Sequence, residues 1–429
     1  MFHYRKTVRP AGTTTAVCRT LWLLALAAVS LQARAQLNLD EALRLALADD
    51  PAIAASLARA QAHTDNAIAD GQLPDPKLKT GILNLPTDTL DIDQEPMTQL
   101  RLGLEQTFPR GATLQLRQRQ SEWLASAEQA RAEDAARQLV RDVRDSFLDL
   151  YYQVQAEQVI AETRDLFAQL VDTTRAHYAS GRVNQQDVLR ATLELSRLDD
   201  RATSIRNAAD RQRATLAKWI GTAASQPLAE EFPELPVLPS RETLETALMQ
   251  HPVIRTESAQ LEAQHQAVRV AREQYKPGWS AGLEYNKRFG DNPGGDERSD
   301  MVSAMVSVEL PLFTAKRQDR RLAASIQQAE AVQLTRDERL RELRQMLDSG
   351  YANWQRLGER AALYESQLLR TSAANAQASL QAYQSGITEF STLMRARITD
   401  LDIQLDLLRI RVDRARAQTS LLYLAGEDL

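Results

Sequence analysis

Cysteine, histidine, aromatic residues and long apolar runs are all scarce in this chain of 429 residues. The single cysteine, Cys18, excludes an internal disulfide and a cysteine-based metal site. No run of about 20 apolar residues is present that could cross a membrane as a helix. No activated nucleophile, glycine-rich phosphate loop or pair of catalytic acids occurs, so we expect no enzyme activity, no catalytic residue and no cofactor. The five histidines lack ligand spacing and indicate no metal site: His3, His63, His177, His251 and His265.

The first 35 residues differ from the rest in charge and hydropathy. Basic residues precede an apolar stretch from Leu21 to Val29, and Ala33 and Ala35 follow with small-x-small spacing. This pattern is typical of a secretory signal that is cut after Ala35. Cleavage removes Cys18, so we expect no lipid anchor on an N-terminal cysteine. Cleavage also removes five basic residues from a net charge of −5. The remaining charge of about −10 argues against nucleic acid as a partner.

Glycine and proline are absent over unusually long stretches. Neither occurs in residues 112–180 or 182–220, and Gly181 separates these two stretches. The second half is similar, with no proline after Pro311 and Gly386 between two long polar and apolar runs. A glycine between two such runs is a helix stop, because it adopts the left-handed conformation after a helix end. The sequence therefore predicts two long helical hairpins, the first helix being a rod of roughly 100 Å.

Apolar residues inside these runs recur every three or four positions. This is the a/d pattern of helices that pack side by side as coiled coils. In the first run the pattern comprises Val140, Val143, Phe147, Leu150 and Val154. In the last it comprises Leu401, Leu405, Leu408, Val412, Ala415, Thr419 and Leu422.

The two halves of the chain are copies of one unit. Asp50-Pro51 matches His251-Pro252, and the hairpin tips at 178–184 and 383–389 correspond, about 200–205 residues apart. A proline-rich segment at 226–240 separates the copies, as an extended linker would. We therefore predict four domains: a signal peptide (1–35), a first repeat (36–225), this linker and a second repeat (241–429).

Each repeat also contains two segments that alternate between apolar and polar residues. They cover residues 77–85 and 98–108 in the first repeat, and 279–289 and 301–310 in the second. Segments of about ten residues with one apolar face are typical of outer-membrane barrel strands. A soluble sheet with one wet face gives the same alternation. The secretory signal and the long helices at the strand ends favour the membrane interpretation.

Four strands cannot close a barrel, because the smallest known barrels have about eight. An open sheet edge in lipid leaves unpaired backbone groups. The membrane interpretation therefore requires several copies, and three copies supply twelve strands and twelve helical segments. The predicted fold is mainly α with a membrane β-barrel: a trimer with a 12-stranded outer-membrane barrel, four strands per chain, continued by a long periplasmic helical barrel.

The duplicated strand–strand–hairpin unit behind a signal peptide resembles the TolC family of outer-membrane efflux ducts. The resemblance rests on Leu39-Asp-Glu-Ala-Leu43 with Asp50-Pro51, on the segments 72–76 and 106–111, and on both Tyr-x-Ser-Gly tips. Residues 71–78 and 83–86 most resemble the heavy-metal branch of the CzcC and CusC type. The resemblance implies a homotrimeric passive conduit in outer-membrane lipid, extending into the periplasm of a Gram-negative cell. It also implies docking to a periplasmic adaptor and an inner-membrane RND pump, for export of heavy-metal cations.

The resemblance assigns roles to two groups of residues near the tips. As adaptor-docking residues we select Tyr178, Ser180, Gly181, Tyr383, Ser385 and Gly386. As candidates for a charged aperture we select Asp187, Glu389, Thr392 and Arg395. The resemblance implies aspartates, as in TolC, at the second-repeat positions, where this chain has Thr392 and Arg395; only the first repeat keeps an acid, Asp187. The alternative for the tips is helix-turn chemistry alone, and the alternative for the aperture group is a set of solvated polar residues on a helix surface.

We expect six residues at the alternate strand positions of the polar face to line a lumen: Arg101, Glu105, Glu284, Met301, Met305 and Glu309. The thioethers of Met97, Met301 and Met305 suit Cu(I), although methionine more often fills space. Alternative functions are a drug-efflux duct and a type I secretion duct. From other classes, the alternatives are a periplasmic adaptor, which would carry only one hairpin, and a soluble coiled-coil protein.

Overall fold

A computed structural model describes residues 36–426 of the chain. The predicted signal peptide, with Cys18, lies outside the described residues. The described chain forms two compact units. The sheet unit comprises Asp49–Arg141, Pro236–Arg356 and residues from Ala417 on, and the hairpin unit comprises residues up to Ala48, Asp142–Leu235 and Leu357–Arg416.

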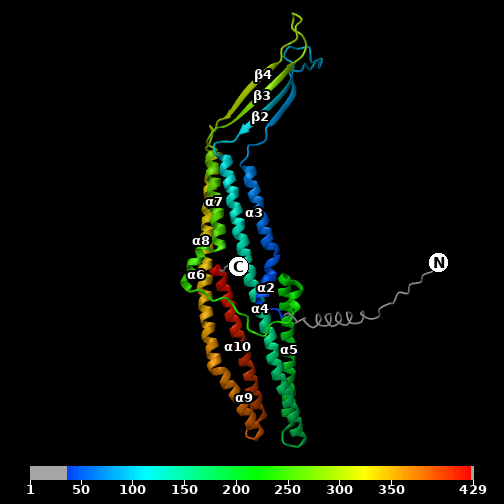
Figure 1. Cartoon of the computed structure of the whole chain (residues 1–429), viewed down its shortest axis with the longest axis vertical. Coiled ribbons are helices and arrows are strands. Elements are labelled where there is room, and N and C mark those ends of the chain that lie inside the picture. The colour runs from blue at the N-terminus through cyan, green and yellow to red at the C-terminus, as the bar shows by residue number, and fades with distance from the viewer. Residues whose placement is uncertain (1–35, 427–429) are drawn as a thin grey trace, which may run out of the picture. The chain divides into compact units, whose positions relative to one another are not determined.

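The sheet unit contains one four-stranded antiparallel sheet with the strand order β1-β2-β3-β4 (Figure 1). Its strands are β1 (Lys77–Leu83), β2 (Gln99–Phe108), β3 (Gly278–Arg288) and β4 (Met301–Glu309). The prediction of four strands per chain is confirmed, with ends that differ from the expected ones by at most two residues. The repeats meet in the middle of the sheet, where Leu102 of β2 pairs with Tyr285 of β3.

Two helices of the sheet unit begin at proline residues that follow a capping side chain. In α3 (Pro51–Asp70) the carboxylate of Asp50 accepts from the backbone N–H groups of Ala52 and Ile53. In α7 (Pro252–Glu273) the imidazole of His251 accepts from the N–H of Val253. Proline suits the first helical position, where its missing N–H leaves nothing unpaired. This unit also holds α6 (Arg241–Ala247), η2 (Leu248–Gln250), the beginnings of α4 and α8, and the end of α10.

The hairpin unit consists of long antiparallel helices. α4 (Thr113–Ala179) is one helix of 67 residues, and α5 (Gln185–Ile220) returns from it. In the second repeat α8 (Gln318–Leu363) and α9 (Leu369–Gln384) are joined by a π turn, η3 (Tyr364–Leu368), before α10 (Phe390–Ala425) returns (Figure 1). The sequence predicts a continuous rod here and gives no signal for the π turn. The unit is completed by α2 (Leu39–Ala48) and η1 (Gly221–Ser225). None of the helices between residues 36 and 426 has the length and apolarity to cross a membrane.

The predicted a/d residues form the core between these helices. Val143, Phe147 and Leu150 of α4 are at most 2% exposed, and Val412 of α10 is fully buried. Val154 and Leu408 are only partly buried. Ion pairs link the same helices, because Asp149 of α4 binds both Arg409 (3.4 Å) and Arg416 (3.2 Å) of α10. The side-by-side packing of the helices is therefore confirmed within this unit.

Candidate functional site: the sheet faces and the helix tips

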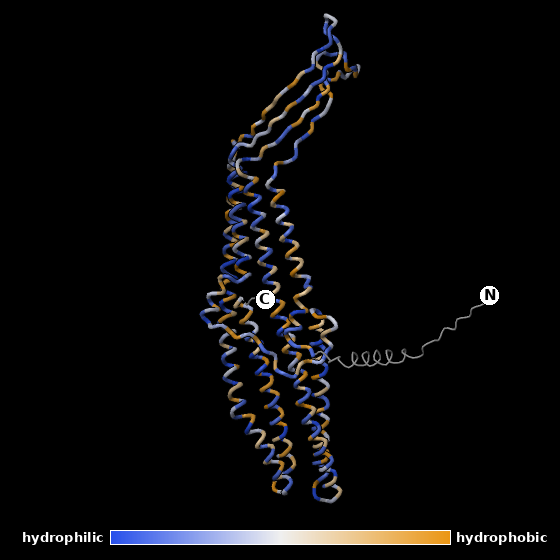
Figure 2. Tube along the Cα trace, viewed as in Figure 1, coloured by the Kyte–Doolittle hydropathy of each residue, from blue (hydrophilic) through white to orange (hydrophobic). Residues whose placement is uncertain are grey.

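The two faces of the sheet differ sharply in chemistry. On one face, leucine, isoleucine, valine and tyrosine side chains project outward, and each is 40–70% exposed. They are Leu78, Ile82, Leu100, Leu102, Leu104, Leu283, Tyr285, Val302, Val306 and Val308. The alternation along each strand is visible as changing hydropathy in Figure 2. Contiguous exposed apolar surface of this extent marks contact with a membrane or another protein.

The opposite face carries an ion pair between the two repeats. The guanidinium Nε of Arg101 on β2 lies 3.3 Å from Oε2 of Glu284 on β3. Glu284 is 5% exposed, because its side chain lies over Gly103, where an added Cβ would come within 2.7 Å of it. Gly103 therefore has a packing role that the strand pattern alone did not reveal.

The other predicted lumen residues share this polar face. Glu105 pairs with Lys79 of β1, and Glu309 pairs with Arg110 at 2.9 Å. Met305 lies opposite Gly282, and Met301 lies opposite the buried Asn286, so both thioethers belong to the same face. The third methionine, Met97, lies in the β1–β2 loop and not in a strand. Among the residues that the structure describes, no group of three His, Cys, Asp or Glu side chains is placed to hold a metal ion.

A glycine and a carboxylate fix the passage from strand to helix in the first repeat. Gly111 has a φ of +50°, and a Cβ there would lie 1.7 Å from Oε2 of Glu273. The same Oε2 accepts the N–H of Ala112 at 2.8 Å, just before α4 begins. The ammonium of Lys276 and this backbone N–H both hold the pKa of Glu273 below its usual range. A charged carboxylate of α7 thus caps α4.

Both helix tips end in the same backbone motif. After α4, the N–H of Arg182 bonds to the carbonyl of His177 at 2.9 Å, and Gly181 has a φ of +73°. After α9, the N–H of Ile387 bonds to the carbonyl of Ala382 at 2.9 Å, and Gly386 has a φ of +72°. This is the Schellman arrangement, which favours glycine because of its positive φ. No atom lies within 4 Å of an added Cβ at either glycine, so conformation and not crowding selects it.

The side chains at the two tips differ in what they contact. Tyr178 is 48% exposed, whereas Tyr383 packs against Phe390 with ring centroids 5.5 Å apart. Ser180 donates its hydroxyl to the carbonyl of His177, and Ser385 is exposed. Tyr178, Ser180, Gly181, Ser385 and Gly386 are therefore exposed, whereas Tyr383 packs largely against the core of the hairpin unit.

The four aperture candidates lie close to the tips but do not form a network in the single chain. Glu389 accepts the hydroxyl of Ser391 at 3.3 Å. Within residues 36–426, no ion pair joins Asp187, Glu389 and Arg395. Thr392 and Arg395 are exposed, and Asp187 is half-buried. Their role at an aperture therefore stays a prediction that depends on neighbouring chains.

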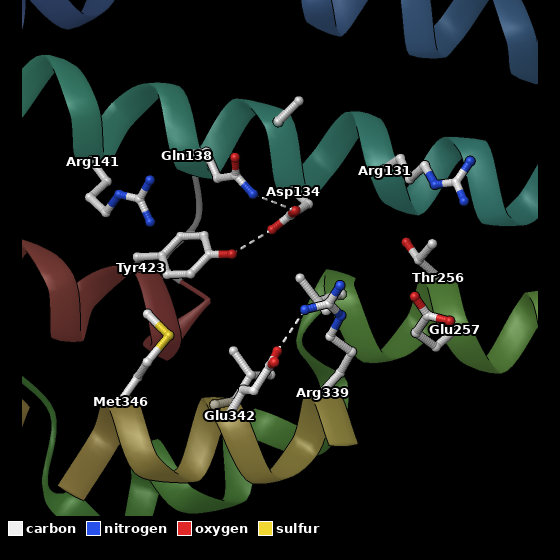
Figure 3. Close-up of a pocket in the computed structure, with 13 residues that line it drawn as sticks. Arg131, Asp134, Gln138, Arg141, Thr256, Glu257, Arg339, Glu342, Met346 and Tyr423 are labelled. Atoms are coloured by element: carbon white, nitrogen blue, oxygen red, sulfur yellow. Dashed lines mark hydrogen bonds and ion pairs between the residues drawn. The ribbon is translucent and has the colours of Figure 1, made fainter. Parts of the chain in front are cut away.

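Sequence reasoning missed one polar pocket in the sheet unit. A pocket of about 520 Å³ lies where the end of α10 meets the beginning of α7, between α4 and α8 (Figure 3). On one wall Tyr423 donates its hydroxyl to Asp134 at 2.8 Å, and Gln138 donates to the same carboxylate at 2.8 Å. On the other wall Arg339 and Glu342 form an ion pair at 2.7 Å. The only signal near this site was that His251-Pro252 matches Asp50-Pro51 of the other repeat.

Comparison with known families identifies the class of protein that has this fold and two-faced sheet. The model of the outer membrane efflux protein family matches residues 42–222 and again 243–427. The chain belongs to this family. The family is one of efflux channels and not of enzymes.

Individual relatives are distant in sequence and similar in structure. The cobalt-zinc-cadmium resistance protein CzcC of Cupriavidus metallidurans is 25% identical over 307 residues, which cover 70% of this chain and 69% of that protein. A crystal structure of CusC superposes with a TM-score of 0.77 at 16% identity, covering 92% of this chain and 93% of CusC. The outer membrane protein VceC of Vibrio cholerae gives a TM-score of 0.75 at 17% identity, covering 90% and 96%.

Proposed function

We propose that three copies of this chain form the exit duct of a tripartite efflux system that exports heavy-metal cations. The observation that carries the proposal is the sheet. One of its faces exposes apolar side chains and the other carries ion pairs. Neither β1 nor β4 has an outer neighbour within the described chain.

Closure of the sheet by identical copies satisfies both edges. The β4 edge of one chain would pair with the β1 edge of the next, and three chains would close a ring of twelve strands. The apolar face would then meet outer-membrane lipid, and the face with Arg101 and Glu284 would line the pore. The long helices would continue as a tunnel in the periplasm.

Partners would meet this duct at the hairpin ends. The exposed residues Tyr178, Ser180 and Ile387 present an accessible surface there, Ile387 being 78% exposed. We propose that they bind the helical hairpins of a periplasmic adaptor, which would connect the duct to an inner-membrane RND pump. The duct itself would be passive, and the pump would supply the energy.

The metal cargo is supported by the kind of relative and by the chemistry of the sheet. CzcC is a cobalt-zinc-cadmium resistance protein by name. Met301 and Met305 on the polar face of the sheet would supply soft contacts for Cu(I).

Growth of a deletion strain tests the cargo. We expect loss of the gene to lower tolerance to cobalt, zinc, cadmium or copper, and plasmid-borne wild type to restore it. Sensitivity to drugs alone, with metals tolerated normally, would replace the metal assignment by a drug-efflux duct. A defect confined to a secreted protein would instead indicate a secretion duct.

Membrane extraction tests the duct itself. We expect the processed protein in the outer-membrane fraction, released only by detergent and running as a trimer that dissociates on heating. A water-soluble monomer without affinity for bilayers would refute the duct and favour a soluble coiled-coil protein.

A further inference from the structure

The segment between β4 and α8, which follows the last strand of the sheet, exposes three large apolar side chains. Leu310, Leu312 and Phe313 are 62%, 72% and 81% exposed, and they lie outside any helix or strand. Leu310 directly follows the apolar face of β4, on which Val306 and Val308 are also exposed. A strand of nine residues, tilted as in a barrel, spans about 25 Å, so this segment would lie where the apolar band of the membrane ends.

Four basic residues follow within eight positions of Phe313. Lys316, Arg317, Arg320 and Arg321 are all exposed, and the structure gives none of them an ion-pair partner among the described residues. The acid among them, Asp319, accepts a hydrogen bond from the hydroxyl of Tyr275 at 2.6 Å. The result is a compact surface of positive charge directly beside an exposed apolar one.

The corresponding passage of the first repeat is built differently. There Phe108 stacks on Trp279 with ring centroids 4.0 Å apart, and Arg110 binds both Glu309 and the carbonyl of Gln274. The aromatic ring and the cation of the first repeat therefore have partners within the chain. The exposed ring of Phe313 and the exposed charges of the second repeat are therefore not a general requirement for joining a strand to a helix.

The position of these charges at the beginning of a helix is unfavourable in isolation. α8 begins at Gln318, and the N-terminal end of a helix carries a partial positive charge. Cations at this end repel that charge, and four of them also repel one another. An anion bound between them would remove both penalties.

We propose that this segment, Leu310–Arg321, is a binding site for the anionic phospholipid headgroups of the adjoining membrane leaflet. Leu312 and Phe313 enter the acyl boundary, while Lys316, Arg317, Arg320 and Arg321 bind the headgroup phosphates. The inference rests on the proposed outer-membrane location. A lipid fits better than a soluble anion because the apolar and basic surfaces are contiguous, and the apolar one continues the face of the sheet.

Thermal unfolding of the purified trimer in neutral detergent provides the test. The probes are short-chain phosphatidylglycerol, phosphatidylcholine of the same chain length, and inorganic phosphate. We expect phosphatidylglycerol to raise the midpoint by about 3 °C more than phosphatidylcholine does. Inorganic phosphate, which lacks acyl chains, should have a smaller effect.

Variants separate the two parts of the site. The double variants K316Q/R317Q and R320Q/R321Q should each reduce the preference for phosphatidylglycerol, and the quadruple variant should abolish it. Replacement of Leu312 and Phe313 by serine should abolish the lipid effect and keep that of phosphate. The matched control R344Q/R370Q removes two exposed charges elsewhere and should behave as the wild type.

Three results would overturn the inference. These are equal stabilisation by both lipids, phosphatidylglycerol preference retained in the quadruple variant, and an equal or larger response to phosphate than to lipid. Loss of the trimer in the double variants at unchanged lipid preference would instead show that these residues contact another subunit. An integral membrane trimer that lacks the preference refutes only this inference, whereas a soluble protein refutes the proposed function as well.

Discussion

The imidazole of His251 lies edge-on against the ring of Tyr423, with centroids 4.8 Å apart, and its Nε2 is 3.2 Å from the Tyr423 carbonyl. The other ring nitrogen, Nδ1, accepts the N–H of Val253 at 3.4 Å. Nδ1 must therefore be unprotonated, and Nε2 carries the hydrogen that is donated to the carbonyl. One neutral ring thus joins the last turn of α10 to the first turn of α7.

This arrangement makes the junction sensitive to acid. Burial is the largest influence on the pKa of His251 and lowers it. Arg137 also lowers this pKa, whereas Asp134 and the Tyr423 carbonyl raise it. The unfolded chain takes up a proton at His251 near pH 6.5, and the folded chain does so only at lower pH. The contribution of neutral His251 to folding stability is therefore complete above about pH 6.5 and is lost as the pH falls below that value. We expect slower hydrogen exchange of the first turn of α7 at pH 7.5 than at pH 5.5, after correction for intrinsic rates.

Asparagine at position 251 is the matched control, because its side-chain oxygen can cap α7 without titrating in this range. His251→Asn should therefore flatten the dependence between pH 7.5 and 5.5. An unchanged pH profile in this variant would assign the dependence to another group.

The hydroxyl of Tyr423 supports the same junction. Tyr423→Phe removes its hydrogen bond to Asp134 and leaves Gln138 as the carboxylate's neutral donor. We expect a loss of about 1 kcal/mol in the free energy of unfolding, measured by denaturant titration. The ring remains, so contacts with His251 should persist. No loss of stability would show that water replaces the hydroxyl without cost.

Gly111 is the most constrained glycine at the sheet–helix boundary. Gly111→Ala combines a positive φ with a clash against the carboxylate of Glu273. We expect a destabilisation of about 2 kcal/mol, with α4 losing its cap. Gly181→Ala has a positive φ without a clash and should cost only about 1 kcal/mol. Equal costs for both variants, measured by thermal unfolding, would contradict the role of Glu273.

The ion pair on the polar face of the sheet predicts opposite effects of its two halves on ion flow. Glu284→Gln leaves the guanidinium of Arg101 uncompensated and should make the pore less cation-selective. Arg101→Gln leaves Glu284 uncompensated and should make it more so. Reversal potentials in planar bilayers measure both shifts. Identical selectivity in both variants would place this face outside the conduction path.

The two tip tyrosines predict a separation of docking from stability. Tyr178→Ala removes an exposed ring and should weaken adaptor binding while unfolding remains unchanged. Tyr383→Ala removes a ring packed on Phe390 and should destabilise the protein by about 2 kcal/mol. Crosslinking to the adaptor and thermal unfolding distinguish the two. Normal adaptor crosslinking in Tyr178→Ala would remove this residue from the docking surface.

Local chemistry made the strands and helix ends predictable. Alternation alone assigned Arg101 and Glu284 to polar positions, and only glycine suits the φ at 181 and 386. Their partners were not predictable, because the pairing of β2 with β3 decides that Glu284 meets Arg101. His251 and Tyr423 are 172 positions apart, and no local pattern indicates that helix ends so distant in sequence meet.

The π turn at Tyr364–Leu368 makes the two hairpins of one chain unequal. A π turn accommodates one extra residue within an α-helix. α4 has no such turn, so the tip at Gly181 and the tip at Gly386 follow helices of different construction. A closed ring of three chains would therefore offer six ends of two alternating kinds. A partner ring of six identical subunits would have to bind these tips in two distinct ways, or bind only every second tip.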